Sequence, residues 1–218
     1  MEDPDAYQFH HVPHTAAYSF QGHFLVSDQV SKDDVELVWK SLEHTLEARI
    51  PGAVVEFGCY VGTTSLFIRR LLQERQENER PFHVYDSFVG LPEKRAEDAS
   101  AAGVDFGAGK LSVGKKEFLR QFHAAGLTPP IVHKAWFNEL TESDVPNEIA
   151  FAFLDGDFYD SILDSLKLVW PRMHAGGTVL IDDYKRPELP GVERAVRTFF
   201  MGNLPNIQVV HNIAVLHK

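Results

Sequence analysis

The stretch Phe153-Leu154-Asp155-Gly156-Asp157-Phe158-Tyr159 places two carboxylates directly after an apolar run that is typical of a buried strand. A second stretch, Thr178-Val179-Leu180-Ile181-Asp182-Asp183-Tyr184, has the same form. Carboxylates at the carboxyl ends of two neighbouring strands would share one crevice, where they repel each other unless a cation binds or a proton is shared. Hard divalent cations such as Mg²⁺ prefer oxygen ligands. The two stretches therefore predict a metal site in an α/β fold.

Strands and helices alternate on both sides of these stretches. Hydrophobic periodicity predicts strands at 53–57, 82–85, 131–135, 149–154 and 178–181, and helices at 32–49, 63–76, 112–125, 161–170 and 191–201. Gly176-Gly177 is expected to turn the chain into the last of these strands. Two further runs, Ile207–Val210 and Ile213–Leu216, predict a terminal antiparallel hairpin. The expected fold class is α/β, with a mostly parallel central sheet and helices on both faces.

The length and composition fit one domain with an N-terminal extension. The chain has 218 residues, of which 44% are hydrophobic, and this is enough for one well-buried core. Residues 1–50 are expected to form an aromatic, histidine-rich arm and a helix that begins after Ser31 as N-cap. This part would serve as a lid or as a contact in a homo-oligomer. Residues 51–218 would form the α/β domain.

The overall charge indicates which partners to expect. A net charge of −10 argues against a nucleic acid or an anionic membrane as the main partner. The sequence contains no apolar run of the roughly 20 residues that span a bilayer, and its acidic start does not resemble a signal peptide. The single cysteine, Cys59, excludes an intrachain disulfide and is typical of a cytoplasmic protein.

A glycine-containing turn follows the first strand of the predicted domain. Gly58 and Gly62 are separated by three residues, which is not the G-x-G-x-x-G spacing of dinucleotide-binding proteins. A pyrophosphate ligand, and with it an NAD-dependent oxidoreductase, is therefore disfavoured. Glu56 ends the strand as a carboxylate that can accept hydrogen bonds from an amine. Asp86 ends the next strand, in a position that suits hydrogen bonds to ribose hydroxyls.

Several stretches of the chain resemble the macrocin O-methyltransferase family. The matching stretches are Val54–Gly62, Tyr85–Pro92, Ala135–Phe137, Leu154–Ser161 and Gly176–Tyr184, in the family's order and spacing. The most specific is Asp86-Ser87-Phe88-Val89-Gly90-Leu91-Pro92. The resemblance implies a Rossmann-like class I methyltransferase fold that uses S-adenosylmethionine and Mg²⁺ to methylate a hydroxyl group, in secondary-metabolite biosynthesis.

The resemblance also implies roles for individual residues. Asp157 would be the general base, although its role and that of Asp155 could be exchanged. The cofactor would contact Glu56, Gly58, Tyr60, Asp86, Ser87, Trp136 and Asp155. The metal ligands would be Asp155, Asp182 and Asp183.

Some features depart from the family and leave the acceptor open. Ala135 stands where the family has glycine, and the N-terminal arm does not match clearly. The expected acceptor is a sugar or another polyhydroxylated small molecule. The alternatives are a catechol-type O-methyltransferase and a non-catalytic protein that binds S-adenosylmethionine.

Other polar residues near the motifs have two interpretations each. Asp157 could cap the following helix, although Asp160 is the better candidate for that role. His133 is an alternative base but is expected in the core or at the surface. Tyr159 and Tyr184 could contact the substrate or only pack. The Lys185-Arg186 pair could attract an anionic substrate, and we expect instead a solvated pair.

Overall fold

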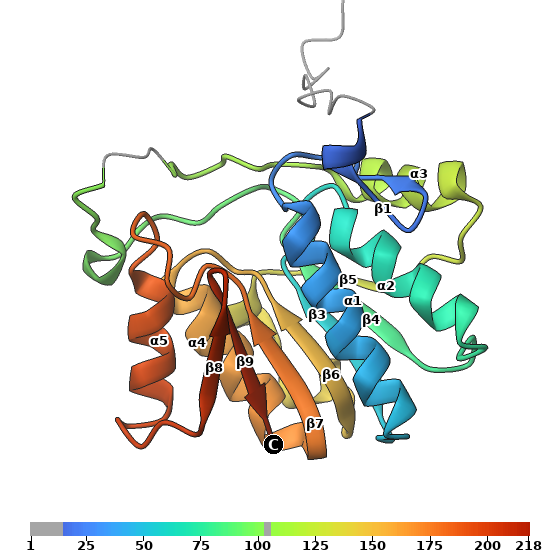
Figure 1. The fold of residues 1–218 in the computed structure, drawn as a ribbon. Coiled ribbons are helices and arrows are strands. Elements are labelled where there is room, and N and C mark those ends of the chain that lie inside the picture. Colours follow the sequence, from blue (N-terminus) through green and yellow to red (C-terminus); the bar gives the residue numbers. More distant parts are fainter. Residues whose placement is uncertain (1–14, 103–105) are drawn as a thin grey trace, which may run out of the picture.

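The computed structural model describes residues 15–102 and 106–218. A seven-stranded sheet has the strand order β5-β4-β3-β6-β7-β9-β8, and a separate hairpin joins β1 to β2 (Figure 1). The strands are β1 (Ser19–Phe20), β2 (His23–Phe24), β3 (Ala53–Phe57), β4 (Phe82–Asp86), β5 (Ile131–Lys134), β6 (Ile149–Leu154), β7 (Met173–Ile181), β8 (Ile207–Val210) and β9 (Ile213–His217). Strands β5, β4, β3, β6 and β7 pair in parallel, whereas β9 is antiparallel to both β7 and β8. The predicted fold class is confirmed.

Helices cover both faces of this sheet. The α-helices are α1 (Lys32–Glu47), α2 (Thr63–Glu74), α3 (Lys115–Ala125), α4 (Tyr159–Val169) and α5 (Gly191–Phe199). Short 3₁₀ turns are η1 (Ala16–Tyr18), η2 (Ala96–Asp98), η3 (Phe137–Glu139), η4 (Glu142–Asp144) and η5 (Trp170–Arg172). Each predicted helix is present. Ser31 caps α1 as expected, in a reciprocal capping box with Asp34.

The strand β7 differs from its prediction. It begins at Met173, so Gly176 and Gly177 lie inside the strand and the predicted turn at these glycines is wrong. The pairing with β6 shifts register between Ile149 and Phe151, as a β-bulge does. A Cβ at Gly177 would lie 2.9 Å from the carbonyl oxygen of Ala150. The glycine therefore permits a close approach of two backbones within the sheet.

The start of α4 also differs from its prediction. The helix begins at Tyr159, two residues before Ser161, and its N-cap is Phe158, whose side chain makes no capping bond. Asp160 lies within the first turn, so it is not the cap. The carboxylate that accepts a hydrogen bond from the Tyr159 backbone N–H is Asp98, at 2.7 Å. A residue 61 positions away cannot be found from local capping rules.

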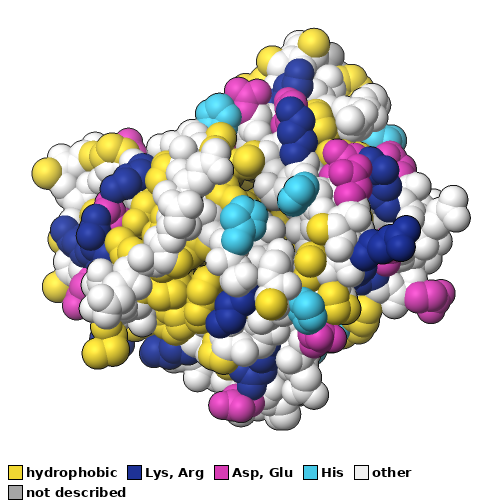
Figure 2. Space-filling model, turned by 60° about the horizontal axis from the view of Figure 1, so that its bottom comes forward, with side chains coloured by type: hydrophobic (Ala, Val, Ile, Leu, Met, Phe, Trp, Pro, Cys, Tyr) yellow, Lys and Arg dark blue, Asp and Glu magenta, His cyan; other side chains and the backbone are white. Residues whose placement is uncertain are grey.

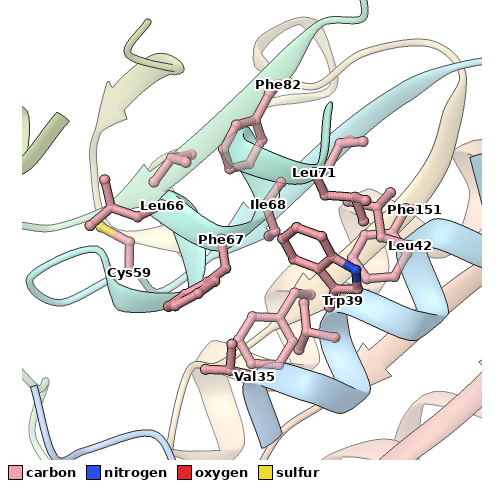
Figure 3. Packing of buried hydrophobic residues seen from close by; sticks show 14 of the residues in the cluster. Val35, Trp39, Leu42, Cys59, Leu66, Phe67, Ile68, Leu71, Phe82 and Phe151 are labelled. Carbon is pink, nitrogen blue, oxygen red and sulfur yellow. The ribbon is translucent and has the colours of Figure 1, made fainter. Parts of the chain in front are cut away.

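The core consists of two layers, one on each face of the sheet. Every residue of β6 is buried, because both faces of this central strand are covered. On one face, Trp39 and Leu42 of α1 pack beside Phe67 and Leu71 of α2 (Figure 3). On the other face, α4 and α5 contribute a second cluster. The two layers hold the carboxyl ends of the central strands in a fixed arrangement.

The described part of the N-terminal arm packs against the helices. The Phe20 ring meets Trp39 edge-on, with ring centroids 5.5 Å apart. Leu25 is buried in the same cluster. Residues 1–14, which belong to the predicted arm, lie outside the described residues. Within residues 15–102 and 106–218, none of the helices is long and apolar enough to cross a membrane.

The amino-terminal ends of the parallel strands lie on the side of the molecule that comes forward in Figure 2. Apolar side chains gather on part of this surface, with Lys and Arg side chains along its border (Figure 2). The carboxylates that the sequence analysis singles out follow the strands at their other ends.

Candidate active site

A single crevice brings together all the residues that the sequence analysis assigned to a site. It lies at the carboxyl ends of β3, β4, β6 and β7, and its volume is about 960 Å³ when its open mouth is counted. It spans the junction of β3 and β6, where the strand order reverses, which is where open α/β sheets bind ligands. The predicted site residues that line it are Glu56, Gly58, Tyr60, Asp86, Ser87, Trp136, Asp155, Asp157, Asp182 and Asp183.

The turn after β3 depends on Gly58. Its φ is +85°, a backbone conformation that other residues rarely adopt. A Cβ at this position would lie 1.8 Å from the carbonyl oxygen of Asp155. The glycine turn and the aspartate stretch are therefore in direct backbone contact. A side chain at position 58 would push these two segments apart.

Glu56 is a fully buried carboxylate with one unsatisfied oxygen. Its Oε2 accepts a hydrogen bond from Ser65 Oγ, while Oε1 has no partner. Burial raises the pKa of Glu56 to about 8. A buried polar atom without a partner that lines a cavity indicates a missing ligand group. A positively charged donor such as an ammonium group would satisfy Oε1 and favour the ionised carboxylate.

Asp86 ties the end of β4 to the glycine turn. Its Oδ2 accepts hydrogen bonds from the backbone N–H groups of Cys59 at 2.9 Å and Tyr60 at 3.3 Å. Its Oδ1 accepts one from the N–H of Phe88 at 2.7 Å. A carboxylate offers about four lone-pair sites, so Asp86 retains acceptor capacity toward a ligand. Cys59 is buried, and burial raises the pKa of its thiol, which suits a packing role.

Three of the four aspartates converge. Asp155, Asp157 and Asp183 each offer a carboxylate oxygen within 4.8 Å of the others. Asp182 lies next to them but outside this group, and its Oδ1 accepts a hydrogen bond from the Asp183 backbone N–H at 2.9 Å. The predicted ligand set of Asp155, Asp182 and Asp183 remains a prediction.

Burial and mutual repulsion shift the titration of the four aspartates. Burial is the main cause that raises the pKa of Asp157 to about 7, and the Asp183 charge adds to it. The pKa values of Asp155, Asp182 and Asp183 are raised as well, again first by burial. Crowded carboxylates that resist ionisation are the donor set that a hard divalent cation would stabilise. The residues therefore fit a bound Mg²⁺.

Two of these aspartates have unusual backbone conformations. Asp157 has a φ of +58° and Asp183 a φ of +54°. Residues other than glycine rarely occupy this region, and such residues concentrate at functional sites. The strand ends thus turn sharply at the two points where carboxylates enter the crevice.

Arg186 is a crevice residue that the sequence analysis considered and set aside. It lines the crevice, and its Nη1 lies 3.1 Å from Asp183 Oδ1. The expectation of a solvated Lys185-Arg186 pair is therefore wrong for Arg186. Lys185 instead pairs with Glu193 at 2.7 Å. A signal was available, since Arg186 follows Asp183 by three residues in the loop after β7.

The segment before α1, which lies in the part of the chain expected to be a lid or an oligomer contact, supplies another wall. Ser27, Gln29 and Val30 line the crevice. The Ser27 hydroxyl lies 3.0 Å from Thr63 Oγ1 at the start of α2, which fixes this segment beside the glycine turn. The irregular segment carries no periodic pattern, so the sequence did not identify which of its residues line the crevice.

Three residues that the sequence analysis considered as possible site residues do not line the crevice. His133 stacks on Tyr85 with ring centroids 4.4 Å apart, and its Nε2 lies 3.0 Å from His83 Nδ1. Tyr184 is buried in the core, and the Tyr159 hydroxyl lies 3.2 Å from Thr198 Oγ1. These residues pack against other parts of the protein rather than against the crevice.

Comparison with known proteins gives a consistent set of relatives. The family model described as macrocin-O-methyltransferase (TylF) matches residues 27–214. A tetracenomycin 4'-O-methyltransferase from Streptomyces olivaceus is 34% identical over 66% of this chain and 57% of its own length. Demethyldecarbamoylnovobiocin O-methyltransferase from Streptomyces niveus is 28% identical over 69% of this chain and 59% of its own. The matches thus span less than two thirds of these curated relatives.

Solved structures share the fold. The O-methyltransferase NovP superposes with a TM-score of 0.75 at 24% identity, covering 87% of this chain and 81% of NovP. The calicheamicin methyltransferase CalS11 gives 0.70 at 19% identity, covering 85% and 80%. An O-methyltransferase from Bacillus cereus, solved in complex with SAH, gives 0.56 at 13% identity, covering 87% and 83%. The class I methyltransferase fold is therefore confirmed.

Proposed function

The chain belongs to the macrocin O-methyltransferase family, and from this premise we propose that it methylates a hydroxyl group of a sugar or another polyhydroxylated small molecule. The methyl donor would be S-adenosylmethionine, with Mg²⁺ bound at the aspartates. The reaction would belong to secondary-metabolite biosynthesis, in line with relatives named for tetracenomycin, novobiocin and mycinamicin. The observation that carries the proposal is the crevice itself, where Glu56 and Asp86 share one cavity with four aspartates.

The donor would bind at the ends of β3 and β4. The unpartnered Oε1 of Glu56 would accept a hydrogen bond from the ammonium group of the methionine part. Gly58 lines the same crevice, and the absence of a side chain there lets its turn pack against the Asp155 backbone. Asp86 would hold the ribose hydroxyls, and Trp136, which also lines the crevice, would flank the adenine.

The acceptor would bind at the ends of β6 and β7. Asp155, Asp182 and Asp183 would hold the cation there. When bound, a divalent cation supplies positive charge that lowers the pKa of an acceptor hydroxyl and stabilises the negative charge that develops on its oxygen. An acceptor with two adjacent oxygens would suit such a site.

Asp157 would accept the proton of the acceptor hydroxyl. The methyl carbon forms a bond to that oxygen as its bond to the sulfonium sulfur breaks, and the electron pair of that bond stays on sulfur. A base is effective when its pKa lies near the working pH. In the metal-free protein burial raises the pKa of Asp157 to about 7. A cation bound at Asp183 would lower this pKa, so that Asp157 is ionised and able to accept the proton.

The convergence of Asp155, Asp157 and Asp183 also permits the alternative in which Asp157 is a metal ligand. The variant Asp157→Asn separates the two roles. If Asp157 is the base, the variant retains Mg²⁺ affinity and loses turnover. If it is a ligand, Mg²⁺ affinity falls together with turnover.

The central experiment is calorimetric titration of S-adenosylmethionine, with and without Mg²⁺, on the wild type and on Asp182→Ala. We expect micromolar cofactor binding in both proteins and Mg²⁺ binding in the wild type alone. A complete lack of cofactor binding would refute the methyltransferase proposal.

An acceptor screen then identifies the substrate class. Methyl transfer to glycosides or free sugars, and none to catechols, is the expected result. Transfer to catechols alone would favour the catechol-type alternative, and cofactor binding without any transfer would favour a non-catalytic protein. We expect no turnover on RNA, although rRNA methylases share the fold, because the chain carries a net charge of −10.

A further inference from the structure

We propose that Asp98 is a positioning residue for Asp157, holding the turn that carries this base in the conformation that methyl transfer requires. The proposal rests on the function proposed above for Asp157. Asp98 lies in η2, in the segment between β4 and α3, and its side chain is 2% exposed. It does not line the crevice, so it would act through the backbone it contacts.

Both carboxylate oxygens of Asp98 accept backbone hydrogen bonds. Oδ1 accepts one from the N–H of Tyr159 at 2.7 Å, and Oδ2 accepts one from the N–H of Arg95 at 3.0 Å. Tyr159 is the first residue of α4, whose own N-cap, Phe158, offers no side-chain acceptor. A carboxylate at this end of a helix also interacts favourably with the helix dipole. Asp98 therefore caps α4 from a distant part of the chain.

The turn that Asp98 closes contains Asp157. The Phe158 N–H donates to the Gly156 carbonyl oxygen at 2.6 Å, across Asp157, whose φ is +58°. A three-residue turn of this kind with a positive φ at its centre is rare and strained. Such a conformation persists only where surrounding contacts hold it. The hydrogen bond from the Tyr159 N–H to Asp98 Oδ1 is such a contact, and it lies two residues after Asp157 in the chain.

Gly191, the first residue of α5, makes room for this arrangement. A Cβ at Gly191 would lie 1.9 Å from Asp98 Oδ1 and 2.9 Å from the Tyr159 nitrogen. The glycine is needed here for space, because any side chain would displace the carboxylate from the helix end. The η2 segment, the start of α4 and the start of α5 are distant in the sequence, and they meet around the hydrogen bond from Tyr159 to Asp98.

Other contacts hold the η2 segment in place independently of Asp98. Arg95 forms an ion pair with Asp160. The Ser100 hydroxyl donates to the Pro187 carbonyl oxygen at 2.7 Å, and Arg194 donates to the carbonyl oxygen of Glu97. A change at Asp98 should therefore release the α4 turn without releasing the whole segment.

Asp98→Ala tests the proposal in two independent ways. It leaves the partly buried N–H of Tyr159 without its carboxylate acceptor, so amide hydrogen exchange at residues 156–160 should accelerate by more than about tenfold. Displacement of a reacting group by about 1 Å can cost about 10²-fold in rate. We therefore expect kcat to fall by about 10- to 100-fold while the Kd for S-adenosylmethionine stays within about twofold.

Three further variants complete the test. Asp98→Asn retains a carbonyl oxygen for the Tyr159 N–H but places its NH2 group against the Arg95 N–H, so it should recover part of the lost kcat. Gly191→Ala should reproduce the effect of Asp98→Ala by displacing the carboxylate, and it provides a second route if Asp98→Ala does not fold. Asp160→Ala is the matched control, because it removes the ion pair to Arg95 and leaves the Tyr159 bond intact.

The outcomes separate this proposal from the proposed function. Unchanged kcat in Asp98→Ala, or an equal loss in Asp160→Ala, would overturn the positioning role. Unchanged hydrogen exchange at residues 156–160 would also overturn it, because this readout needs no turnover. If the wild type methylates none of the acceptors, the proposed function fails, whereas the exchange measurement still tests the contact.

Discussion

Arg186 places its Nη1 3.1 Å from Oδ1 of Asp183, so one guanidinium group already neutralises part of the aspartate cluster. The Arg186 side chain is 38% exposed, whereas that of Asp183 is 10% exposed. The pair therefore extends from the buried cluster to the mouth of the crevice. A cation that enters the cluster would share Asp183 with this arginine.

Replacement of Arg186 should strengthen cation binding. In Arg186→Gln the positive charge beside Asp183 is removed, so repulsion toward an incoming Mg²⁺ falls. Partly exposed pairs of this kind are worth about 0.2–1 kcal/mol, which corresponds to a gain in Mg²⁺ affinity of up to about fivefold. Calorimetric titration of Mg²⁺ measures this gain. Lys185→Gln is the control, because Lys185 pairs with Glu193 and should leave Mg²⁺ affinity unchanged. Weaker Mg²⁺ binding in Arg186→Gln would contradict the argument.

The effect of Mg²⁺ on stability should grow with pH. Burial raises the pKa of Asp157 to about 7 in the folded protein, whereas the unfolded chain ionises near pH 4. The unfolded state therefore binds fewer protons across this interval, and the metal-free protein loses stability as pH rises from about 4 to about 7. Bound Mg²⁺ compensates the ionised carboxylates.

Thermal unfolding at pH 5, 6, 7 and 8, in EDTA and in Mg²⁺, checks this expectation. The difference in Tm between the two conditions should increase from pH 5 to pH 8. The same series on Asp157→Asn should show a smaller increase, because one titrating group is removed. A Tm difference that is constant or decreases with pH would refute the pKa argument.

Glu56→Gln should weaken cofactor binding and stabilise the free protein at high pH. The pKa of Glu56 is raised to about 8 by burial, so the wild type loses stability between about pH 4.5 and pH 8. Glutamine does not ionise in either state, and the variant should gain stability relative to the wild type across that interval. Loss of a charged partner for an ammonium group should weaken S-adenosylmethionine binding by about tenfold or more.

Urea unfolding at pH 5 and pH 9, together with calorimetry, measures both effects. Glu43→Gln in α1 is a suitable control, because Glu43 pairs with Arg75 outside the crevice lining. Cofactor affinity that is unchanged in Glu56→Gln would remove Glu56 from the proposed donor site.

Gly58→Ala should disrupt both stability and binding. The new Cβ would lie 1.8 Å from the Asp155 carbonyl oxygen, and the φ of +85° would be strained as well. Gly202→Ala is the matched control, since Gly202 has a φ of +78° and open space around it. The control should cost about 1–2 kcal/mol from backbone strain alone.

Gly58→Ala should cost several kcal/mol more than this, because backbone atoms must move apart. Urea unfolding of both variants separates the steric effect from the strain. Equal destabilisation of the two proteins would show that the contact with Asp155 is unimportant.

Periodic apolar patterns were sufficient to predict most of the fold. Strands β3 and β6 begin and end as expected, because each is a short buried run bounded by turn residues. The pattern was insufficient at β7, where Gly176 and Gly177 resemble a turn but form a bulge within the strand. The local sequence around a pair of glycines cannot distinguish a turn from a bulge, since the pairing with the neighbouring strands decides which one forms.

The site was predictable where a carboxylate directly follows a strand. Glu56, Asp86 and the four aspartates could be grouped because parallel strands bring their carboxyl ends to one edge. Arg186 was set aside and Gln29 was not named, since each lies in an irregular segment whose path depends on tertiary packing. The same reason applies to Asp98, whose partner Tyr159 is distant in the sequence.

The junction between β3 and β6 joins two halves of the chain. Val54 pairs with Phe151 across this junction. The turn at Gly58 contacts the Asp155 backbone just after the carboxyl ends of the two strands. The residues proposed for the donor come mainly from the first half, and those proposed for the acceptor come from the second. A donor and an acceptor that are bound together would therefore contact both halves of the chain across the crevice. Their binding would raise the force that is needed to separate β3 from β6.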